Sequence, residues 1–230
     1  MKDEIFIKNS VQKLRVGKAT FFLDPKEQKL IEQHFKTSER TYQCFSLYED
    51  CDKVIFYTND MPDITLLKIT SHHPLEHRSI LGSLFALGID SHMFGDIIVG
   101  ENSYVVVLSQ IANLIQYQLD QIGREKVHIE PVDLNILNGY QRKYHYLELK
   151  VPSLRSDAII AKALSMSRSK VLEKINNKEI YLNYENLKNG SKILKEQDVF
   201  SVRKYGKYRF HKILGKTKKN DYRIELWKYE

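Results

Sequence analysis

The stretch that decides the fold lies near the C-terminus: Ser156-Asp-Ala-Ile-Ile-Ala-Lys-Ala-Leu-Ser-Met-Ser-Arg-Ser-Lys-Val-Leu-Glu-Lys-Ile-Asn176. Apolar residues recur at helical spacing in each half of it. Ser156 or Asp157 can cap the start of the first helix, and Ser167 can cap the second. The stretch therefore predicts two short helices joined by a tight turn, which is a helical hairpin.

The second of these helices has a basic side. Lys170 and Lys174 are four residues apart and share a face, while Arg168 lies in the first turn, where free backbone N–H groups and the helix dipole favour a phosphate. Ser167 and Ser169 add hydroxyl donors suited to phosphate oxygens. The pattern indicates a phosphate-binding surface, and an ordinary solvated basic face is the alternative.

Short strand-like segments follow the helix pair, at residues 179–183, 193–194, 198–203, 210–214 and 222–227. Such an order predicts a small α+β unit with a curled sheet. Residues 142–151 alternate well enough for one more strand. Pro152 and Ser153 come directly after it and form the best domain boundary in the chain.

A basic segment with interleaved aromatic residues runs through the last part of the chain. Its members are Arg203, Lys204, Tyr205, Lys207, Tyr208 and Arg209, followed by Lys216, Lys218 and Lys219. Cations bind phosphate, tyrosines can stack on an exposed base or sugar, and Gly206 allows a close backbone approach. This composition indicates contact with nucleic acid.

The charge is unevenly distributed. From residue 151 onward there are 19 Lys+Arg and 9 Asp+Glu, a net charge of +10, whereas residues 1–150 have a net charge of −3. A concentrated basic excess is typical of a domain that binds polyanions, because each cation placed on a phosphate releases counterions. A soluble basic surface without a ligand is the alternative.

Residues 63–131 have a regular order of elements. We expect strands at 64–70, 95–99, 104–108 and 126–131, and helices at 74–87 and 109–122. This is the ferredoxin-like arrangement, which RNA-recognition domains share with many other proteins. Residues 100–108 lack the Lys/Arg-Gly-Phe/Tyr-x-Phe pattern of such domains, so base stacking by this sheet is not expected. Before it, Asp24 and Pro25 predict a helix start, and residues 53–58 a strand.

Four ordered blocks of the C-terminal third resemble the S4 RNA-binding domain. They are Leu154-Arg155-Ser156-Asp157, Ser167-Arg168-Ser169-Lys170, Ile180-Tyr-Leu-Asn183 and Asp198-Val-Phe-Ser-Val-Arg203. The resemblance adds Arg155 and Asn183 to the expected RNA-binding residues. Where the S4 pattern has Gly-Asp and Arg-Gly-Tyr/Phe-Gly-Arg, this chain has Gln197-Asp198 and Arg203-Lys204-Tyr205-Gly206-Lys207, so Lys204 replaces a glycine.

Other segments are similar to motifs of the YlmH family, whose members in Gram-positive bacteria are encoded beside cell-division genes. They are residues 20–28, His77-Arg-Ser-Ile-Leu-Gly82, Gly95-Asp-Ile-Ile-Val99 and Gly215-Lys-Thr-Lys-Lys219. The resemblance implies an α+β protein with a mostly helical N-terminal segment (1–62), a ferredoxin-like middle domain (63–151) and an S4 domain (152–230). It also implies a non-catalytic protein bound to rRNA or tRNA on large ribosomal subunits after stalled translation.

Other chemistry finds less support. His73 and His77 are four residues apart, but no third ligand follows at a zinc spacing, so we expect no metal, and His77 and Arg78 could instead contact RNA or pin a helix. No nucleotide or cofactor motif is present, so we expect no cofactor. The alternatives are an RNA-modifying enzyme, for which Asp96 is the one candidate, and an interaction module for cell division. We expect a cytoplasmic monomer without a membrane segment.

Overall fold

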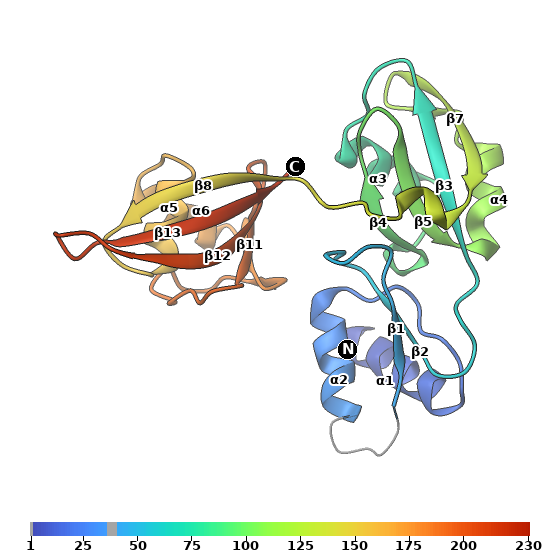
Figure 1. The fold of residues 1–230 in the computed structure, drawn as a ribbon, viewed down its shortest axis with the longest axis horizontal. Helices are drawn as coiled ribbons and strands as arrows, with labels where there is room; N and C mark the ends of the chain where they lie inside the picture. The colour runs from blue at the N-terminus through green and yellow to red at the C-terminus, as the bar shows by residue number, and fades with distance from the viewer. Residues whose placement is uncertain (1, 36–40) are drawn as a thin grey trace. The chain divides into compact units, whose positions relative to one another are not determined.

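A computed structural model describes residues 2–35 and 41–230, and it divides into two compact units, Met1–Gln141 and Arg142–Glu230 (Figure 1). The α+β class expected from the sequence is confirmed. Among the helices of these described residues, none has both the length and the apolar character needed to cross a membrane.

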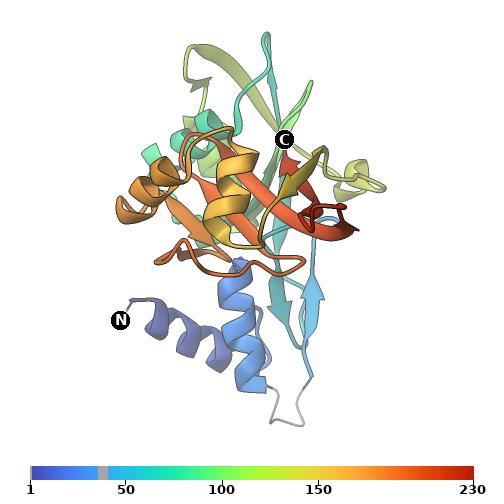
Figure 2. The ribbon, with the colours of Figure 1, turned by 90° about the vertical axis from the view of Figure 1, so that its left-hand side faces the viewer.

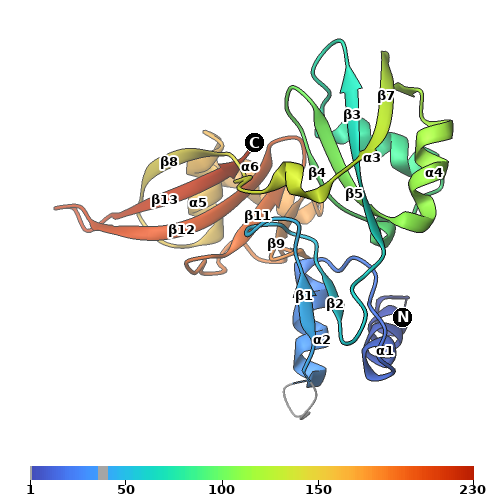
Figure 3. The same ribbon diagram turned by 45° about the vertical axis from the view of Figure 1, so that its right-hand side comes forward.

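The first unit is built on a five-stranded antiparallel sheet of order β4-β5-β3-β7-β6 (Figure 3). Its strands are β3 (Ile64–Ser71), β4 (Phe94–Ile98), β5 (Ser103–Leu108), β6 (Gln121–Ile122) and β7 (Glu125–Val132), with short 3-10 turns at Ser91–Met93 and Leu134–Leu137. The helices are α3 (His77–Ala86) and α4 (Ser109–Gln118). This order of strands is the ferredoxin-like arrangement predicted from the sequence. Helix α4 ends four residues earlier than expected, because β6 takes up the following residues.

Helices α3 and α4 cover one face of this sheet. Leu67 and Ile69 of β3 alternate with Leu66, which points to the other face. Leu67 and Ile69 pack with Ile80 of α3 and Ile115 of α4 in one buried cluster. The helices therefore bury only the apolar strand side chains that point to their face of the sheet.

The other face is covered by the N-terminal segment. This segment contains α1 (Lys2–Arg15), α2 (Pro25–Phe35) and a two-stranded sheet of β1 (Gln43–Phe45) and β2 (Ile55–Tyr57). Its buried Phe22 and Ile55 pack against Leu66 and Val106 of the large sheet. A Cβ atom on Gly95 would lie 2.6 Å from Val106 and 2.8 Å from Phe22, so the close approach of the two layers requires glycine there. The face that binds bases in RNA-recognition domains is thus buried here.

The N-terminal helices have a core of their own. Asp24 and Glu27 form a capping box at the start of α2, each side chain accepting the other's backbone N–H at 2.8 Å. Helices α1 and α2, the two blue helices near the N-terminus, lie against each other (Figure 2). Ile7 and Leu14 of α1 pack with Ile31 of α2. The helix start predicted at Asp24 is confirmed.

Asp96 has a structural role in this unit. Its carboxylate accepts hydrogen bonds from the Tyr48 hydroxyl at 2.6 Å and from the backbone N–H groups of Asp52 at 2.8 Å and Lys53 at 3.2 Å. These three donors tie the loop before β2 to the sheet, which explains the aspartate without catalysis.

The second unit has a six-stranded antiparallel sheet of order β10-β9-β11-β12-β13-β8. Its strands are β8 (Tyr144–Val151), β9 (Ile180–Leu182), β10 (Glu185–Asn186), β11 (Val199–Val202), β12 (Gly206–Lys216) and β13 (Tyr222–Tyr229). Strand β8 pairs with β13 along its whole length, so the structure divides ten residues before the boundary expected at Pro152. The strand expected at 193–194 is wrong: Ile193 makes only a single bridge to Arg155.

One face of this second sheet is covered by α5 (Ser156–Ala163) and α6 (Arg168–Asn176). Ile159 of α5 and Val171 of α6 are fully buried against Phe200, Phe210 and Leu226 of the strands. The helical hairpin predicted from the sequence is therefore present, and it packs on the sheet to form the core of this unit.

Replacing Asp96 by alanine should loosen the loop that it holds. Loss of hydrogen bonds to a charged acceptor should remove about 2 kcal/mol, because such bonds contribute about 1.5–3 kcal/mol each. We expect amide hydrogen exchange of residues 48–57 to become about 30-fold faster. Asp60→Ala, at an exposed aspartate before β3, is the matched control, and equal exchange in the two variants would refute the role given to Asp96.

Candidate nucleic-acid interface

A buried carboxylate organises the start of both helices in the second unit. Asp157 has a side chain only 2% exposed, and it accepts hydrogen bonds from Arg155 at 3.1 and 2.9 Å and from Arg168 at 2.7 Å. Burial by itself raises the pKa of Asp157, but the two guanidinium groups outweigh this and hold the pKa below its ordinary value. Two expected RNA-binding arginines are thus fixed by one anion.

The backbone around Asp157 differs from the expected cap. Helix α5 begins after Arg155, and neither Ser156 nor Asp157 caps it, so that prediction was wrong. Instead the Ser156 hydroxyl and the Asp157 N–H both donate to the carbonyl oxygen of Gly190 at 2.9 Å. A Cβ atom on Gly190 would lie 2.6 Å from Leu172 and 3.0 Å from Asp157. The loop before β11 must therefore come close to both helices, and Asp157 is an anchor that sequence reasoning missed.

Helix α6 begins as predicted. Ser167 is its N-cap, and its hydroxyl accepts the backbone N–H of Lys170 at 3.3 Å. The Ser169 hydroxyl lies 2.9 Å from that of Ser167, so the two serines are hydrogen-bonded to each other. Arg168 remains half exposed at 50%, and Lys170 is exposed. The first turn of α6 presents N–H groups, hydroxyls and two cations to solvent.

The turn between β11 and β12 extends this basic surface. Lys174 of α6 is ion-paired with Glu179 at 2.7 Å, which raises the pKa of the lysine, and its ammonium lies 5.2 Å from the ring centre of Tyr205. The N–H of Arg203 donates to the carbonyl oxygen of Glu179 at 2.9 Å. The exposed turn of Arg203, Lys204 and Tyr205 is thereby held beside the C-terminal half of α6. We call α6 and this turn the helix surface.

The two positions at which this chain lacks a glycine of the S4 pattern have unusual backbone conformations. Gln197 has φ +71° and Lys204 has φ +72°, in the left-handed region that glycine adopts without strain. Asn183, with φ +48°, links its turn to β11 through hydrogen bonds to Asp198 at 2.8 Å and to the N–H of Val199 at 2.9 Å. The turn around Lys204 is formed without its glycine, at the expense of local strain.

Not all of the predicted residues lie on the helix surface. Lys207 and Arg209 alternate with the buried Tyr208 and therefore point to the opposite face of the sheet. Lys216, at the other end of β12, is about 30 Å from the turn at Arg203. Lys218 and Lys219 lie with it in the β12–β13 hairpin.

His77 and Arg78 belong to the other unit, at the start of α3. Arg78 is 85% exposed and forms an ion pair with Glu76. Among the residues that the structure describes, His, Cys, Asp and Glu side chains do not gather in groups of three that could hold a metal ion.

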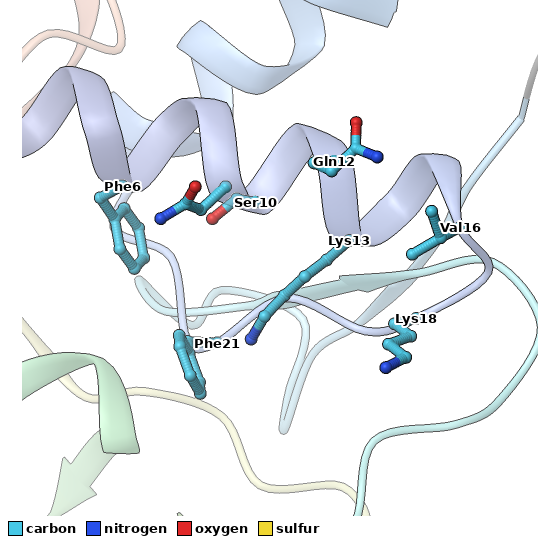
Figure 4. Close-up of a pocket in the computed structure, with 8 residues that line it drawn as sticks. Phe6, Ser10, Gln12, Lys13, Val16, Lys18 and Phe21 are labelled. Carbon is cyan, nitrogen blue, oxygen red and sulfur yellow. The ribbon is translucent and has the colours of Figure 1, made fainter.

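A hollow of about 420 Å³ lies beside α1 and includes none of the predicted site residues (Figure 4). The Lys13 ammonium in it lies 3.4 Å from the ring centre of Phe21. Burial, and after it the charge of Lys18, lowers the pKa of Lys13. The eight lining residues include no carboxylate, thiol or imidazole, so they offer neither an acid–base pair nor metal ligands.

Asp157→Asn should destabilise the second unit by about 2 kcal/mol at pH 7, because it removes charge-assisted hydrogen bonds from a buried acceptor. The folded pKa is lowered, so this contribution is complete above the unfolded pKa of about 3.9 and is lost as pH falls through the folded pKa. Urea unfolding followed by the single tryptophan, Trp227, measures it. The difference in stability between wild type and variant should narrow as pH falls below the unfolded pKa. Glu173→Gln should leave stability unchanged, and a difference independent of pH would contradict the role given to Asp157.

Comparisons with known proteins agree with the resemblance found in the sequence. A family model described as "Putative RNA-binding domain in YlmH" matches residues 63–136. "Ribosome-associated protein quality control protein P2" of Bacillus subtilis (strain 168) is 29% identical over 229 residues, which cover 94% of this chain and 89% of the relative. The solved structure of "Cell division protein ylmH from Streptococcus pneumoniae" is 22% identical, with a TM-score of 0.49, over 59% of this chain and 94% of that one. The family model and the B. subtilis relative thus place the similarity of this chain on the YlmH side, over residues 63–136 and over 94% of the chain respectively.

Proposed function

We propose that this chain is a non-catalytic, cytoplasmic RNA-binding protein that associates with the ribosome through its C-terminal unit. Its ligand is structured rRNA or tRNA on the large subunit, and its role is in the rescue or quality control of stalled translation. The alignment with the B. subtilis ribosome-associated protein along 94% of the chain supports the ribosomal setting.

The helix surface is the observation that carries the proposal. It contains the exposed Lys170, Arg203 and Lys204 and the half-exposed Arg168. Arg168 uses one terminal nitrogen on Asp157, and a guanidinium has five N–H donors, so others remain for a phosphate. Backbone N–H groups at the start of α6 add to the positive potential. Such a surface suits the phosphates of a folded RNA, recognised by shape more than by base identity.

The proposed contact residues form a primary and a secondary group. The primary group is Arg155, Ser167, Arg168, Ser169, Lys170, Lys174, Arg203, Lys204 and Tyr205, with Asn183 holding a neighbouring turn. Lys207, Arg209, Lys216, Lys218 and Lys219 would reach other parts of the same RNA, and His77 and Arg78 would give a contact from the middle domain. Because the sheet face of that domain is covered by Phe22 and Ile55, any RNA contact there would use its loops and helix ends.

Removing charge from the helix surface should weaken binding. We expect the Lys170→Ala, Arg203→Ala, Lys204→Ala variant to remain at the top of a sucrose gradient that carries the wild type with large ribosomal subunits. These three side chains are exposed, so the variant should fold. The control variant Lys188→Ala, Lys192→Ala, Lys195→Ala removes the same charge from exposed sites in the loop before β11 and should still sediment with the subunit.

The salt dependence gives a second readout of the same claim. With about five phosphate contacts, the affinity should fall with a log–log slope of roughly −4 against salt concentration. The triple variant should have a slope about three shallower. A slope near zero, or equal loss in both triple variants, would contradict the proposal and favour a protein-interaction module in which the basic surface has no ligand.

A further inference from the structure

Helices α5 and α6 lie on one side of the C-terminal sheet (Figure 1). Aromatic side chains gather on the opposite, outer face. Leu147 of β8 and Leu226 of β13 point toward the helices and into the core. Side chains alternate along a strand, so Tyr146 and Trp227 point away from the helices. Tyr146 and Trp227, which the sequence pattern indicated only as strand residues, thus lie on one surface.

Strand register aligns these residues in a row. Arg209 of β12 is paired with Trp227 of β13, and Trp227 is paired with Tyr146 of β8. The neighbouring row pairs Tyr229 with Tyr144. The Arg209 guanidinium lies 5.5 Å from the ring centre of Tyr229 and 5.8 Å from that of Tyr144, so the basic side chain bridges both rows.

The rings are held in fixed positions but are not sealed from solvent. Trp227 stacks on His211 with ring centres 3.7 Å apart, and its indole N–H donates to Glu225 at 2.7 Å. Tyr146 meets Trp227 edge-on at 5.5 Å and is 62% exposed. Trp227 is partly buried between His211 and Tyr144, whereas the exposed ring of Tyr146 can receive a flat ligand without rearrangement.

Cations flank the rings on one side. The Lys207 ammonium lies 4.6 Å from the ring centre of Tyr229, next to Arg209. Farther along the strands, Glu148 is ion-paired with Arg223 at 2.6 Å, so this carboxylate is compensated. A second carboxylate, Glu225, accepts the Trp227 indole N–H and lies 3.9 Å from His211. Lys207 and Arg209, with Arg142 at 5.1 Å from the Tyr229 ring centre, still leave an excess of cations beside the aromatic rows, which favours RNA over a protein surface as the occupant.

We propose that this sheet face stacks unpaired bases of the bound RNA, with Tyr146 and Trp227 as the platform and Lys207 and Arg209 on the adjoining phosphates. The inference rests on the proposed function and deepens it: the helix surface binds the backbone of a folded RNA, and the sheet face takes a single-stranded segment. A purely structural role for the aromatic pairs, stabilising neighbouring strands, is the competing account.

Trp227 is the only tryptophan of the chain, so its fluorescence reports directly on this face. The full chain is titrated with oligoadenylate and with an abasic ribose-phosphate oligomer of the same length and charge. We expect oligoadenylate to quench Trp227 and the abasic oligomer to leave it bright. Tyr146→Ala should weaken oligoadenylate binding about ten-fold, whereas Tyr117→Ala, at an 86% exposed tyrosine of α4, should leave it unchanged.

Folding is separated from binding by a second variant. Tyr146→Leu keeps an apolar side chain in the strand but removes the aromatic ring, so it should fold and still lose affinity. Equal quenching by the abasic oligomer, or unchanged affinity in Tyr146→Leu, would overturn the inference. Binding of an RNA hairpin separates the sheet-face inference from the proposed function. If the hairpin binds and oligoadenylate does not, the proposed function stands, the sheet-face inference fails and a protein partner becomes the occupant of that face. If neither RNA binds, the proposed function and the sheet-face inference both fail.

Discussion

The buried carboxylate of Asp157 is the interaction on which the C-terminal unit depends. It holds Arg155 before α5 and Arg168 at the start of α6, and the Asp157 N–H donates to Gly190, so one residue links both helix starts to the loop at Gly190. A lone buried carboxylate would be strongly unfavourable, and the two guanidinium groups compensate it. The same contact leaves both arginines partly exposed, at 39% and 50%, with N–H groups still available. Stability and the proposed phosphate recognition therefore depend on one cluster.

Local patterns in the sequence were sufficient for much of the fold. The helix start at Asp24 and Pro25 and the cap by Ser167 at the start of α6 are signals read within a few residues, and both are confirmed. Pairing partners are not local. Residues 142–151 were recognised as a strand, yet nothing near them shows that they pair with residues 222–229 at the end of the chain. Helix α1 was not predicted, because its apolar positions are interrupted by polar residues and its core is supplied by α2 and β2.

The candidate site was only partly predictable for the same reason. A run of cations from Arg203 to Arg209 looks like one surface in the sequence. Side chains alternate along β12, which begins at Gly206, so Lys207 and Arg209 point to the face of the sheet opposite α5 and α6. Arg203 and Lys204 precede the strand and lie beside α6. Asp157 was considered only as a helix cap. Its role as an anchor was missed, because an acidic residue does not suggest an RNA site unless its two arginine partners are known. Phe22 likewise covers the middle sheet by packing with Leu66 and Val106, which lie more than 40 positions away from it in the sequence.

We propose that the main RNA contact lies on the helix surface of the C-terminal unit and not on the middle sheet. Hydrogen exchange of the full chain, measured with and without large ribosomal subunits, tests this most directly. We predict slower exchange on binding at residues 167–174 and 203–205, and unchanged exchange in the buried strands β3 and β5. Protection confined to residues 63–136, with the C-terminal unit unaffected, would contradict it.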